Sequence, residues 1–261
     1  MNKLSISIVV YKKYDDALLA IESIEQFTES SLSKIIYVID NSNYANENQK
    51  KIAFLKKIEK YSDVEYLETG KNLGFGKGHN YVLPTLESEF HAIVNPDIIL
   101  YSDVFSSLVN FLQNNPDVGL TAPILTNERN SILRVYRRDL TIYDLICRYI
   151  HLPFMKNRID WHTMESVDKS KNFECEFIQG SFLVLRTNLF KNSKGFDERY
   201  FMYAEDADLC RTIRKTAKIV VCPDVKAVHK WEKASHTSFK LMRIHAISLA
   251  KYFNKWGWKW A

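Results

Sequence analysis

The stretch Phe90-His91-Ala92-Ile93-Val94-Asn95-Pro96-Asp97 joins a short apolar run to a proline and a carboxylate. An uninterrupted apolar run of this length is typical of a strand buried in a parallel sheet, and the proline ends the pairing of that strand. Asp97 is therefore predicted at the carboxyl end of a strand. Ligands of open α/β sheets bind along that edge, where a carboxylate can hold a metal ion against a diphosphate.

The residues on either side of this stretch alternate between strand-like and helix-like patterns. Strands are predicted over 4–11, 34–39, 64–67, 90–94, 118–125, 173–186 (broken at Gly180-Ser181) and 218–222, the last of which leads through Pro223 to His229. Helices are predicted over 15–27, 103–114, 142–152, 205–215 and 239–256, and through 52–58. Such alternation predicts right-handed βαβ units and an α/β fold with a mostly parallel, Rossmann-type sheet flanked by helices. Residues 1–100 form the predicted nucleotide-binding half.

The composition is that of a globular protein, with 46% hydrophobic and 13% aromatic residues among 261. The apolar run at the N-terminus is too short for a signal peptide, and no window reaches the ~18 apolar residues of a membrane span, so a cytoplasmic location is expected. Cys147, Cys175, Cys210 and Cys222 form no C-x-x-C pair. They are predicted to be free, mostly buried thiols.

The positive charge is concentrated in the C-terminal tail. From residue 226 onward eight Lys or Arg stand against one acid, giving +7, so the preceding 225 residues carry −2 of the net +5. In the helix predicted over 239–256, apolar residues from Leu241 to Trp256 share one face, and Lys240, Arg243, Lys251 and Lys255 lie opposite. This pattern suits an interfacial helix on anionic lipid, or a helix packed on the domain with a solvated basic edge. Nucleic-acid binding is disfavoured, because no recognised motif accompanies the charge.

Seven short motifs occur in an order that is more specific than any of them alone. They are Val10-Tyr11 at the end of the first strand, Asp40-Asn41-Ser42, Asn72-Leu73-Gly74-Phe75-Gly76, Asn95-Pro96-Asp97, Gly180-Ser181, Phe201-Met202-Tyr203-Ala204-Glu205-Asp206 and His229. Together they make the chain resemble an inverting family-2 glycosyltransferase of the GT-A fold, most similar to bacterial rhamnosyltransferases that build O-antigen or capsule. The resemblance implies a GT-A domain over 1–237, with its acceptor and catalytic half over 101–237, and a C-terminal helical extension over 238–261.

On the donor side, the resemblance implies that Val10, Tyr11 and Asp40 hold the base and ribose of the nucleotide sugar. Asn72, Gly74, Gly76, Lys77 and Asn95 are the further donor-binding candidates. Four of the chain's eight glycines fall within nine residues here, which suits a loop lying against a ligand. The alternatives are a capping or turn role for Asp40, an ordinary strand-to-helix turn for the glycines and a solvated surface position for Lys77.

Asp97 is the predicted ligand of Mg²⁺ or Mn²⁺ and a further donor-binding residue. Asn95 replaces the first acid of the usual Asp-x-Asp, so a second ligand is needed, and the resemblance points to His229. Imidazole suits Mn²⁺ better than Mg²⁺. The alternative for His229 is a purely structural role.

On the acceptor side, an inverting transfer needs one carboxylate that takes the proton of the attacking hydroxyl. Asp206 is the predicted base, Glu205 is predicted to orient the acceptor, and Gly180 and Ser181 are predicted to approach the acceptor sugar. The alternative is an acidic pair that merely begins a helix. Residues 126–172 lie between the two halves and are expected to shape acceptor choice.

The expected reaction moves L-rhamnose from dTDP-L-rhamnose to a hydroxyl of a surface-polysaccharide or lipid-linked glycan, with peripheral membrane contact through the C-terminal helix at the cytoplasmic face of the inner membrane. A UDP-sugar transferase, for galactofuranose or a hexose, is the first alternative. A non-catalytic module that binds nucleotide sugar or glycan is the second, since Asn95 lacks the expected charge.

Overall fold

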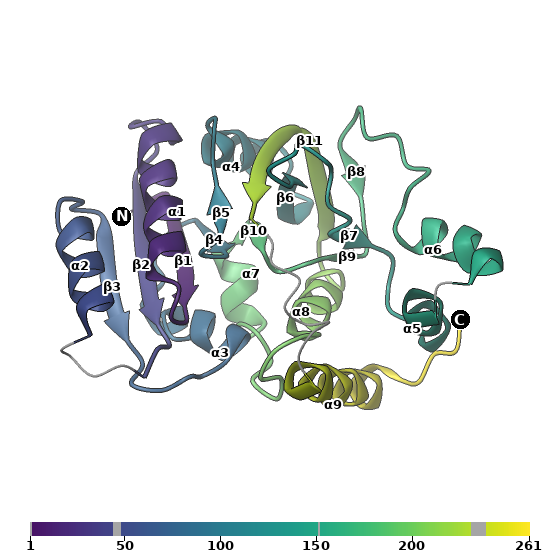
Figure 1. Ribbon diagram of the computed structural model, residues 1–261. Coiled ribbons are helices and arrows are strands. Elements are labelled where there is room, and N and C mark those ends of the chain that lie inside the picture. The colour runs from purple at the N-terminus through teal and green to yellow at the C-terminus, as the bar shows by residue number, and fades with distance from the viewer. Residues whose placement is uncertain (1, 44–47, 151, 231–238) are drawn as a thin grey trace.

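A computed structural model describes residues 2–43, 48–150, 152–230 and 239–261 (Figure 1). The predicted boundary between the main domain and the C-terminal extension, at 237/238, lies outside these residues. No helix in the described ranges is both long and apolar enough to cross a bilayer. All four cysteines are buried and free, as predicted.

A nine-stranded sheet runs through the described part of the chain in the order β3-β2-β1-β4-β10-β6-β11-β5, with β8 paired to β11 off this path. The strands are β1 (Leu4–Val10), β2 (Lys34–Asp40), β3 (Val64–Glu68), β4 (Phe90–Val94), β5 (Ile98–Ile99), β6 (Val118–Thr126), β8 (Phe173–Glu174), β10 (Phe182–Arg186) and β11 (Lys218–His229). Strands β7 (Tyr136–Arg137) and β9 (Phe177–Ile178) pair separately. The sheet is parallel from β3 to β4. Beyond β4 it is mixed, because β10 runs antiparallel to both of its neighbours.

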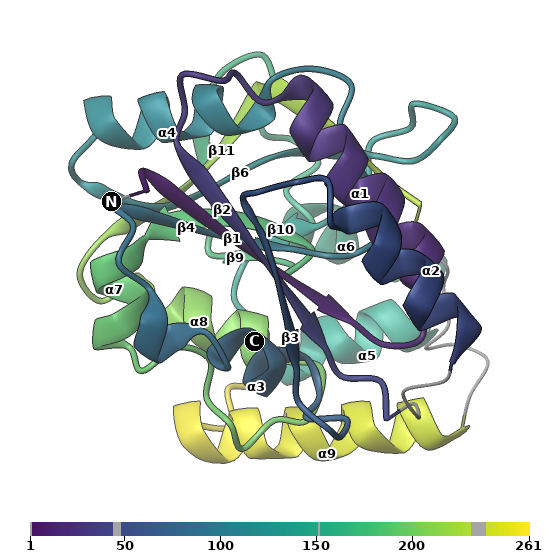
Figure 2. The ribbon, with the colours of Figure 1, turned by 90° about the vertical axis from the view of Figure 1, so that its left-hand side faces the viewer.

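Helices cover both sides of this sheet. They are α1 (Tyr14–Phe27), α2 (Gln49–Ile58), α3 (Phe75–Asn80), α4 (Val104–Asn114), α5 (Ile142–Ile150), α6 (Lys156–His162), α7 (Thr187–Asn192), α8 (Glu205–Ile213) and α9 (Phe239–Trp256), with 3₁₀ turns η1 (Leu83–Thr85) and η2 (Pro153–Met155). Figure 2 shows α1, α2 and α4 on one side of the sheet and α3, α7 and α8 on the other, with α9 running beneath the latter group. The α/β architecture predicted from the alternating pattern is therefore observed.

The parallel half places three predicted motifs at one edge. Val10 pairs with Asp40 across β1 and β2, and Ile8 pairs with Val94 across β1 and β4. The carboxyl ends of these strands therefore lie together, at the lower edge of Figure 1. The strands form because their side chains are buried on both faces, which favours continuous β-branched and apolar sequence.

The structure corrects three details of the predicted elements. Strand β11 continues past Pro223 to His229, with a register shift between Cys222 and Lys226 that accommodates the proline. The segment predicted as one strand over 173–186 forms three strands. On α2, Ile52 is half exposed and Lys51 is buried instead, where its ammonium pairs with Glu68 at 2.7 Å.

The C-terminal helix α9 packs against the domain. Tyr252 and Phe253 are buried, as the predicted apolar face requires, whereas Met242 at the other end of that face is 53% exposed. The basic face is exposed at Lys251 and Lys255, as the solvated alternative requires, but both lysines also contact the domain. Lys251 donates to the Arg199 carbonyl at 2.6 Å, and Lys255 pairs with two carboxylates of the domain.

Candidate active site

The turn 95–97 lies where β4 gives way to β5. Asn95 donates its backbone N–H to the Ser181 carbonyl at 2.9 Å, and Lys230 donates to the Asp97 carbonyl at 3.0 Å. Strand β5 pairs antiparallel with β11, with His229 opposite Ile98. This pairing brings His229 Nε2 within 3.2 Å of Asp97 Oδ1, so the two residues predicted as metal ligands do meet.

The electrostatics at Asp97 favour the ionised carboxylate. Burial raises its pKa, but hydrogen bonding to His229 and the charges of His229 and Lys13 outweigh burial, and the pKa falls below its ordinary value. One carboxylate and one imidazole fit a partial site for Mg²⁺ or Mn²⁺. The described residues contain no cluster of three or more His, Cys, Asp or Glu, so further ligands would have to be donor phosphate oxygens and water.

Asp40 lies at the end of β2 and is held by three donors. Tyr14 and Tyr66 hydroxyls donate to Oδ2 at 2.6 and 2.5 Å, and the Ser42 N–H donates to Oδ1 at 2.7 Å. The side chain is only 1% exposed. Asp40 therefore fixes Tyr14, Tyr66 and the following turn, and its contact with a nucleotide stays a prediction. The two tyrosines were not identified from sequence, because no local pattern links residues 14, 40 and 66.

The glycine loop contacts protein closely at the positions where glycine is needed. A Cβ on Gly74, which has φ +84°, would lie 2.0 Å from the Phe201 carbonyl oxygen. A Cβ on Gly76 would lie 2.8 Å from the Phe196 Cβ. Glycine at these positions is thus explained by packing of the loop on the segment that precedes α8, and donor contact by Gly74 and Gly76 stays a prediction.

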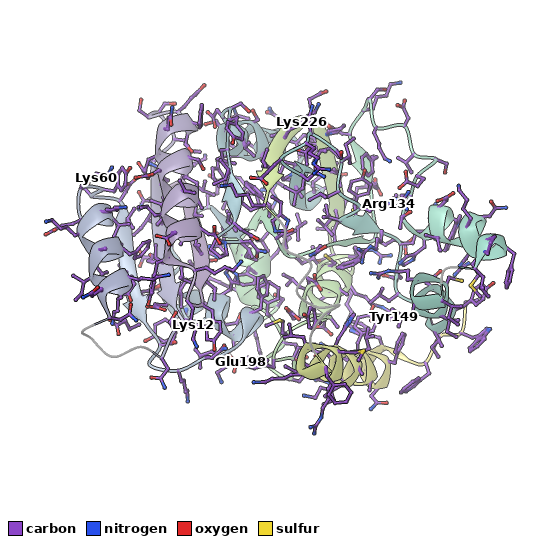
Figure 3. All side chains as sticks on the ribbon, in the orientation of Figure 1. Lys12, Lys60, Arg134, Tyr149, Glu198 and Lys226 are labelled. Carbon is purple, nitrogen blue, oxygen red and sulfur yellow. The ribbon has the colours of Figure 1, made fainter. Side chains whose placement is uncertain are left out.

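Two other predicted donor-binding residues have defined protein partners. Asn72 accepts from the Gly74 N–H at 2.9 Å and so shapes the loop. Lys77 Nζ pairs with Glu198 Oε2 at 2.8 Å, and both side chains are about half exposed. Lys12 and Glu198 lie along the lower edge of Figure 3, on the side where the parallel strands end. Phosphate contact by Lys77 would therefore compete with an exposed ion pair, which costs little to break.

Asp206 begins the first turn of α8 and faces the break before β10. Its Oδ2 accepts the Gly180 N–H at 3.0 Å, and its Oδ1 accepts the Ala207 N–H at 2.9 Å. A Cβ on Gly180 would lie 3.3 Å from the Asp206 Cβ, so glycine allows this approach. Ser181 follows directly and joins the turn 95–97. Gly180-Ser181 therefore links the predicted base to the predicted metal turn.

The pKa is raised for both neighbouring acids, but different groups act on each of them. Burial, followed by the charge of Asp206, raises the pKa of Glu205 to about 8, so Glu205 is mostly neutral at pH 7. Burial also raises the pKa of Asp206, but the backbone donors and the charge of Arg137 partly offset this effect. Asp206 is partly exposed and Glu205 is buried. One carboxylate that can accept a proton thus stands beside one acid that can donate a hydrogen bond.

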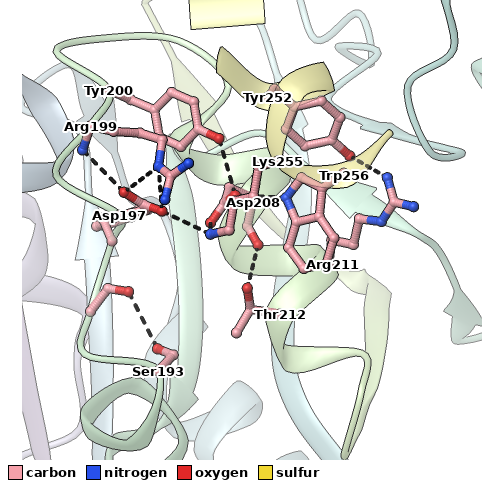
Figure 4. Close-up of polar contacts among 12 residues, drawn as sticks. Ser193, Asp197, Arg199, Tyr200, Asp208, Arg211, Thr212, Tyr252, Lys255 and Trp256 are labelled. Atoms are coloured by element: carbon pink, nitrogen blue, oxygen red, sulfur yellow. Dashed lines mark hydrogen bonds and ion pairs between the residues drawn. The ribbon is translucent and has the colours of Figure 1, made fainter. Parts of the chain in front are cut away.

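Asp208 has a different role from the acids that precede it. Its Oδ1 accepts from Trp256 Nε1 at 2.7 Å and from the Tyr200 hydroxyl at 3.1 Å, while Oδ2 accepts from Lys255 Nζ at 2.8 Å (Figure 4). Asp197 also pairs with Lys255 at 2.8 Å. This cluster fastens α9 to the helix that carries Asp206.

Most of the chain matches one known protein family. The family model described as glycosyltransferase like family 2 matches residues 16–246. The chain belongs to this family. Strand β1, the turn 95–97, the glycine loop, Asp206 and His229 all lie in or beside the matched range, so the resemblance read from the motifs is confirmed at the level of family.

Curated relatives of this family 2 glycosyltransferase share low identity with it. N-acetylglucosaminyl-diphospho-decaprenol L-rhamnosyltransferase of Mycobacterium tuberculosis is 28% identical over 189 residues, which are 66% of this chain and 60% of the relative. The chain thus spans about 60% of that relative's length. Rhamnosyltransferase WbbL of Escherichia coli is 25% identical over 233 residues, 82% of this chain and 86% of the relative. The hexosyltransferase Agl10 of Haloferax volcanii is 24% identical over 234 residues, which are 88% of this chain and 67% of the relative.

Solved structures share its fold. GalNAc-T7, crystallised with UDP, GalNAc and Mn²⁺, aligns with TM-score 0.65 and 12% identity, over 94% of this chain and 47% of that one. Staphylococcus aureus TarS 1–349, in complex with UDP, aligns with TM-score 0.59 and 15% identity, over 95% of this chain and 65% of that one. At such identities the likeness concerns the fold alone, and it confirms the predicted GT-A-like architecture.

Proposed function

We propose that this family 2 glycosyltransferase transfers a sugar with inversion from a nucleoside diphosphate donor to a hydroxyl of a glycan acceptor, with residues 1–100 binding the donor. The observation that supports this most directly is the link through Gly180-Ser181. It joins the Asp97–His229 pair, where a donor diphosphate and its metal would be held, to Asp206 on the acceptor side.

In the proposed reaction Asp206 Oδ accepts the proton of the acceptor hydroxyl as that oxygen attacks C1 of the donor sugar. The new C1–O bond forms on the face opposite the breaking bond to the diphosphate, which leaves with that electron pair. Glu205, neutral at pH 7, donates a hydrogen bond that orients the acceptor. A divalent ion bound at Asp97 and His229 would supply positive charge to the leaving phosphates.

The proposed donor is dTDP-L-rhamnose. Two curated relatives carry rhamnosyltransferase names, and the name of the mycobacterial relative specifies a diphosphate-linked lipid acceptor. A hexosyltransferase among the relatives supports the alternative of a UDP-sugar donor. We take a lipid-linked or surface glycan as the acceptor by analogy with these names.

We further propose peripheral contact with the membrane that carries such an acceptor. Phe239 and Phe154 are 79% and 74% exposed, and the tail residues Trp258 and Trp260 are also exposed. The backbone of this tail bonds to the start of α5, where Ile142 donates to the Lys259 carbonyl at 3.0 Å and Tyr143 to that of Trp260 at 2.9 Å. Exposed aromatic residues beside lysines are typical of an interfacial surface. The contact involves α5 and the tail as well as α9, since half of α9 is packed on the domain.

The test combines ligand binding with donor turnover. The melting temperature is measured with dTDP and with UDP, each with and without Mn²⁺, for the wild type and for Asp97→Asn. We expect stabilisation by dTDP that depends on Mn²⁺ and that is lost in Asp97→Asn, together with hydrolysis or transfer of dTDP-L-rhamnose. Stabilisation by UDP alone would keep the reaction and change the donor. Nucleotide binding without turnover of either donor would favour the non-catalytic module.

A further inference from the structure

Two arginines from the segment between the halves approach the catalytic helix. Arg137 belongs to β7, whose partner strand β9 leads directly to Gly180, and Arg148 belongs to α5. The two guanidinium groups are close enough to interact electrostatically with each other, and both interact with Asp206. Strand β7 and helix α5 therefore bring two positive charges within electrostatic reach of the proposed base on α8.

These arginines differ from their neighbours in the same segment. Arg158 pairs with Asp144 at 2.6 Å and Arg134 with Glu165 at 2.7 Å, while Asp139 of this segment pairs at 2.6 Å with Arg214 from the end of α8. Within the ranges that the structure describes, neither Arg137 nor Arg148 has an ion pair of this kind. The acids Asp139, Asp144 and Glu165 of this segment are thus already paired with other arginines.

The hydrogen bonds of Arg137 are also incomplete. Its Nη2 donates to the Arg134 carbonyl at 3.0 Å, but its buried Nε has no hydrogen-bond partner among the described atoms. Asp206 does not supply one in this structure; its oxygens accept the backbone N–H groups of Gly180 and Ala207. Burial, followed by the charge of Arg148, lowers the pKa of Arg137 to about 9. Two adjacent desolvated cations that form no direct ion pair among the described residues are costly, and a bound anion would reduce that cost.

We infer that Arg137 and Arg148 bind a phosphate group of the acceptor, next to the hydroxyl that Asp206 deprotonates. The planar guanidinium group offers paired N–H donors that match phosphate oxygens. This inference rests on the proposed function and specifies its acceptor as a phosphate-linked glycan.

The surroundings of Arg148 fit the lipid part of such an acceptor. The residues that follow it, Tyr149 and Ile150, are 55% and 54% exposed, and Phe154 continues this apolar surface. Tyr149, which Figure 3 places between α5 and α9, lies 2.9 Å from His245 Nδ1 through its hydroxyl. A phosphate at the arginine pair would thus have an apolar surface beside it for a prenyl chain.

The experiment measures binding without chemistry. Farnesyl diphosphate and farnesol are titrated into the protein by calorimetry, with saturating dTDP and Mn²⁺ to fill the donor site. We expect the wild type to prefer the diphosphate, and Arg148→Gln and Arg137→Gln each to weaken binding of farnesyl diphosphate by about ten-fold or more, as for a lost charged hydrogen bond. Arg134→Gln is the matched control, because this arginine lies in the same segment with its charge already paired, and it should bind like the wild type.

Three outcomes would overturn the inference. They are equal binding by wild type and both variants, loss of binding in Arg134→Gln to the same extent, and displacement of farnesyl diphosphate by dTDP, which would place the anion in the donor site. Folding is checked by melting temperature. Removing an unpaired buried charge should leave it unchanged or raise it, whereas Arg158→Gln, which breaks the pair with Asp144, should lower it. Failure of the proposed function would instead appear as a wild type that turns over no nucleotide sugar.

Discussion

The surroundings of Asp40, on the proposed donor side, and those of Glu205 and Arg137, on the proposed acceptor side, satisfy their polar groups in opposite ways. At the donor edge, Asp40 accepts from two tyrosines and a backbone N–H. On the acceptor side, Glu205 Oε2 and Arg137 Nε are buried with no hydrogen-bond partner in the described chain. Buried polar groups normally have partners. The difference indicates that the protein itself sets the shape of the turn at Asp40, and it agrees with the proposal that a substrate completes the hydrogen bonds near Glu205 and Arg137.

The same contrast occurs within one helix. Asp206 faces the acceptor side and is held only by backbone donors, whereas Asp208 is bound on both oxygens by side chains of Tyr200, Lys255 and Trp256. Helix α8 thus carries one carboxylate, Asp206, that we propose for chemistry and one, Asp208, that holds structure. Substitutions at the two positions should separate these functions.

The largest expected effect follows from Asp206→Asn. Asparagine keeps the shape and can still accept one backbone N–H, but it cannot take a proton, so the transfer rate should fall by about 10²- to 10⁴-fold. Steady-state transfer and melting temperature are measured together. A variant that folds and still transfers within about two-fold of wild type would exclude Asp206 as the base.

Gly74→Ala should give the largest loss of stability, because a Cβ there meets the Phe201 carbonyl at 2.0 Å and φ is +84°. We expect a loss of about 3 kcal/mol in the free energy of unfolding, measured by urea denaturation. Gly70→Ala is the matched control. Its φ is +69° with nothing within 4 Å of the added carbon, so only the backbone cost of about 1 kcal/mol applies. Equal losses would show that the loop does not pack on Phe201.

Asp208→Ala tests whether α9 is part of the folded domain. The change leaves the buried Trp256 N–H and the Lys255 ammonium without this carboxylate, and we expect a loss of about 2 kcal/mol in the free energy of unfolding. Proteolysis should then begin in α9. An unchanged stability would mean that α9 detaches readily, as an interfacial helix would.

The smallest effect concerns the core of the donor half, where His79 and His91 are bonded to Ser7. Burial lowers the pKa of His91 to about 3 and lowers that of His79. The unfolded chain therefore binds more protons below pH 6.5, so stability is full above that pH and falls as the pH drops. From pH 7.5 to 6 the loss should be about 1–1.5 kcal/mol, and His91→Gln should reduce this slope. A slope that His91→Gln leaves unaltered would assign it to other groups.

Secondary structure was predicted better in the parallel half of the sheet than in the mixed half beyond β4. Strands β1 to β4 and helices α1 and α4 were predicted correctly, because buried parallel strands and amphipathic helices leave strong local patterns, whereas the two-residue strand β5 was not predicted. The mixed part beyond β4 was less legible: the predicted 173–186 strand divides into three, and β11 runs on past Pro223. Short strands whose partners are far away in sequence carry little local signal.

The sequence by itself determined the α/β class, the end of β4 at Val94 and the family to which the motifs belong, because each depends on residue type and order. Only the tertiary structure decided which groups meet. The pairing of β5 with β11 brings His229 to Asp97, and Asp40 accepts hydrogen bonds from Tyr14 and Tyr66. Gly74 packs on the Phe201 carbonyl, and Arg137 and Arg148 lie within electrostatic reach of Asp206. These contacts join residues far apart in the chain. Their geometry follows from sheet order and helix packing, which no local pattern encodes.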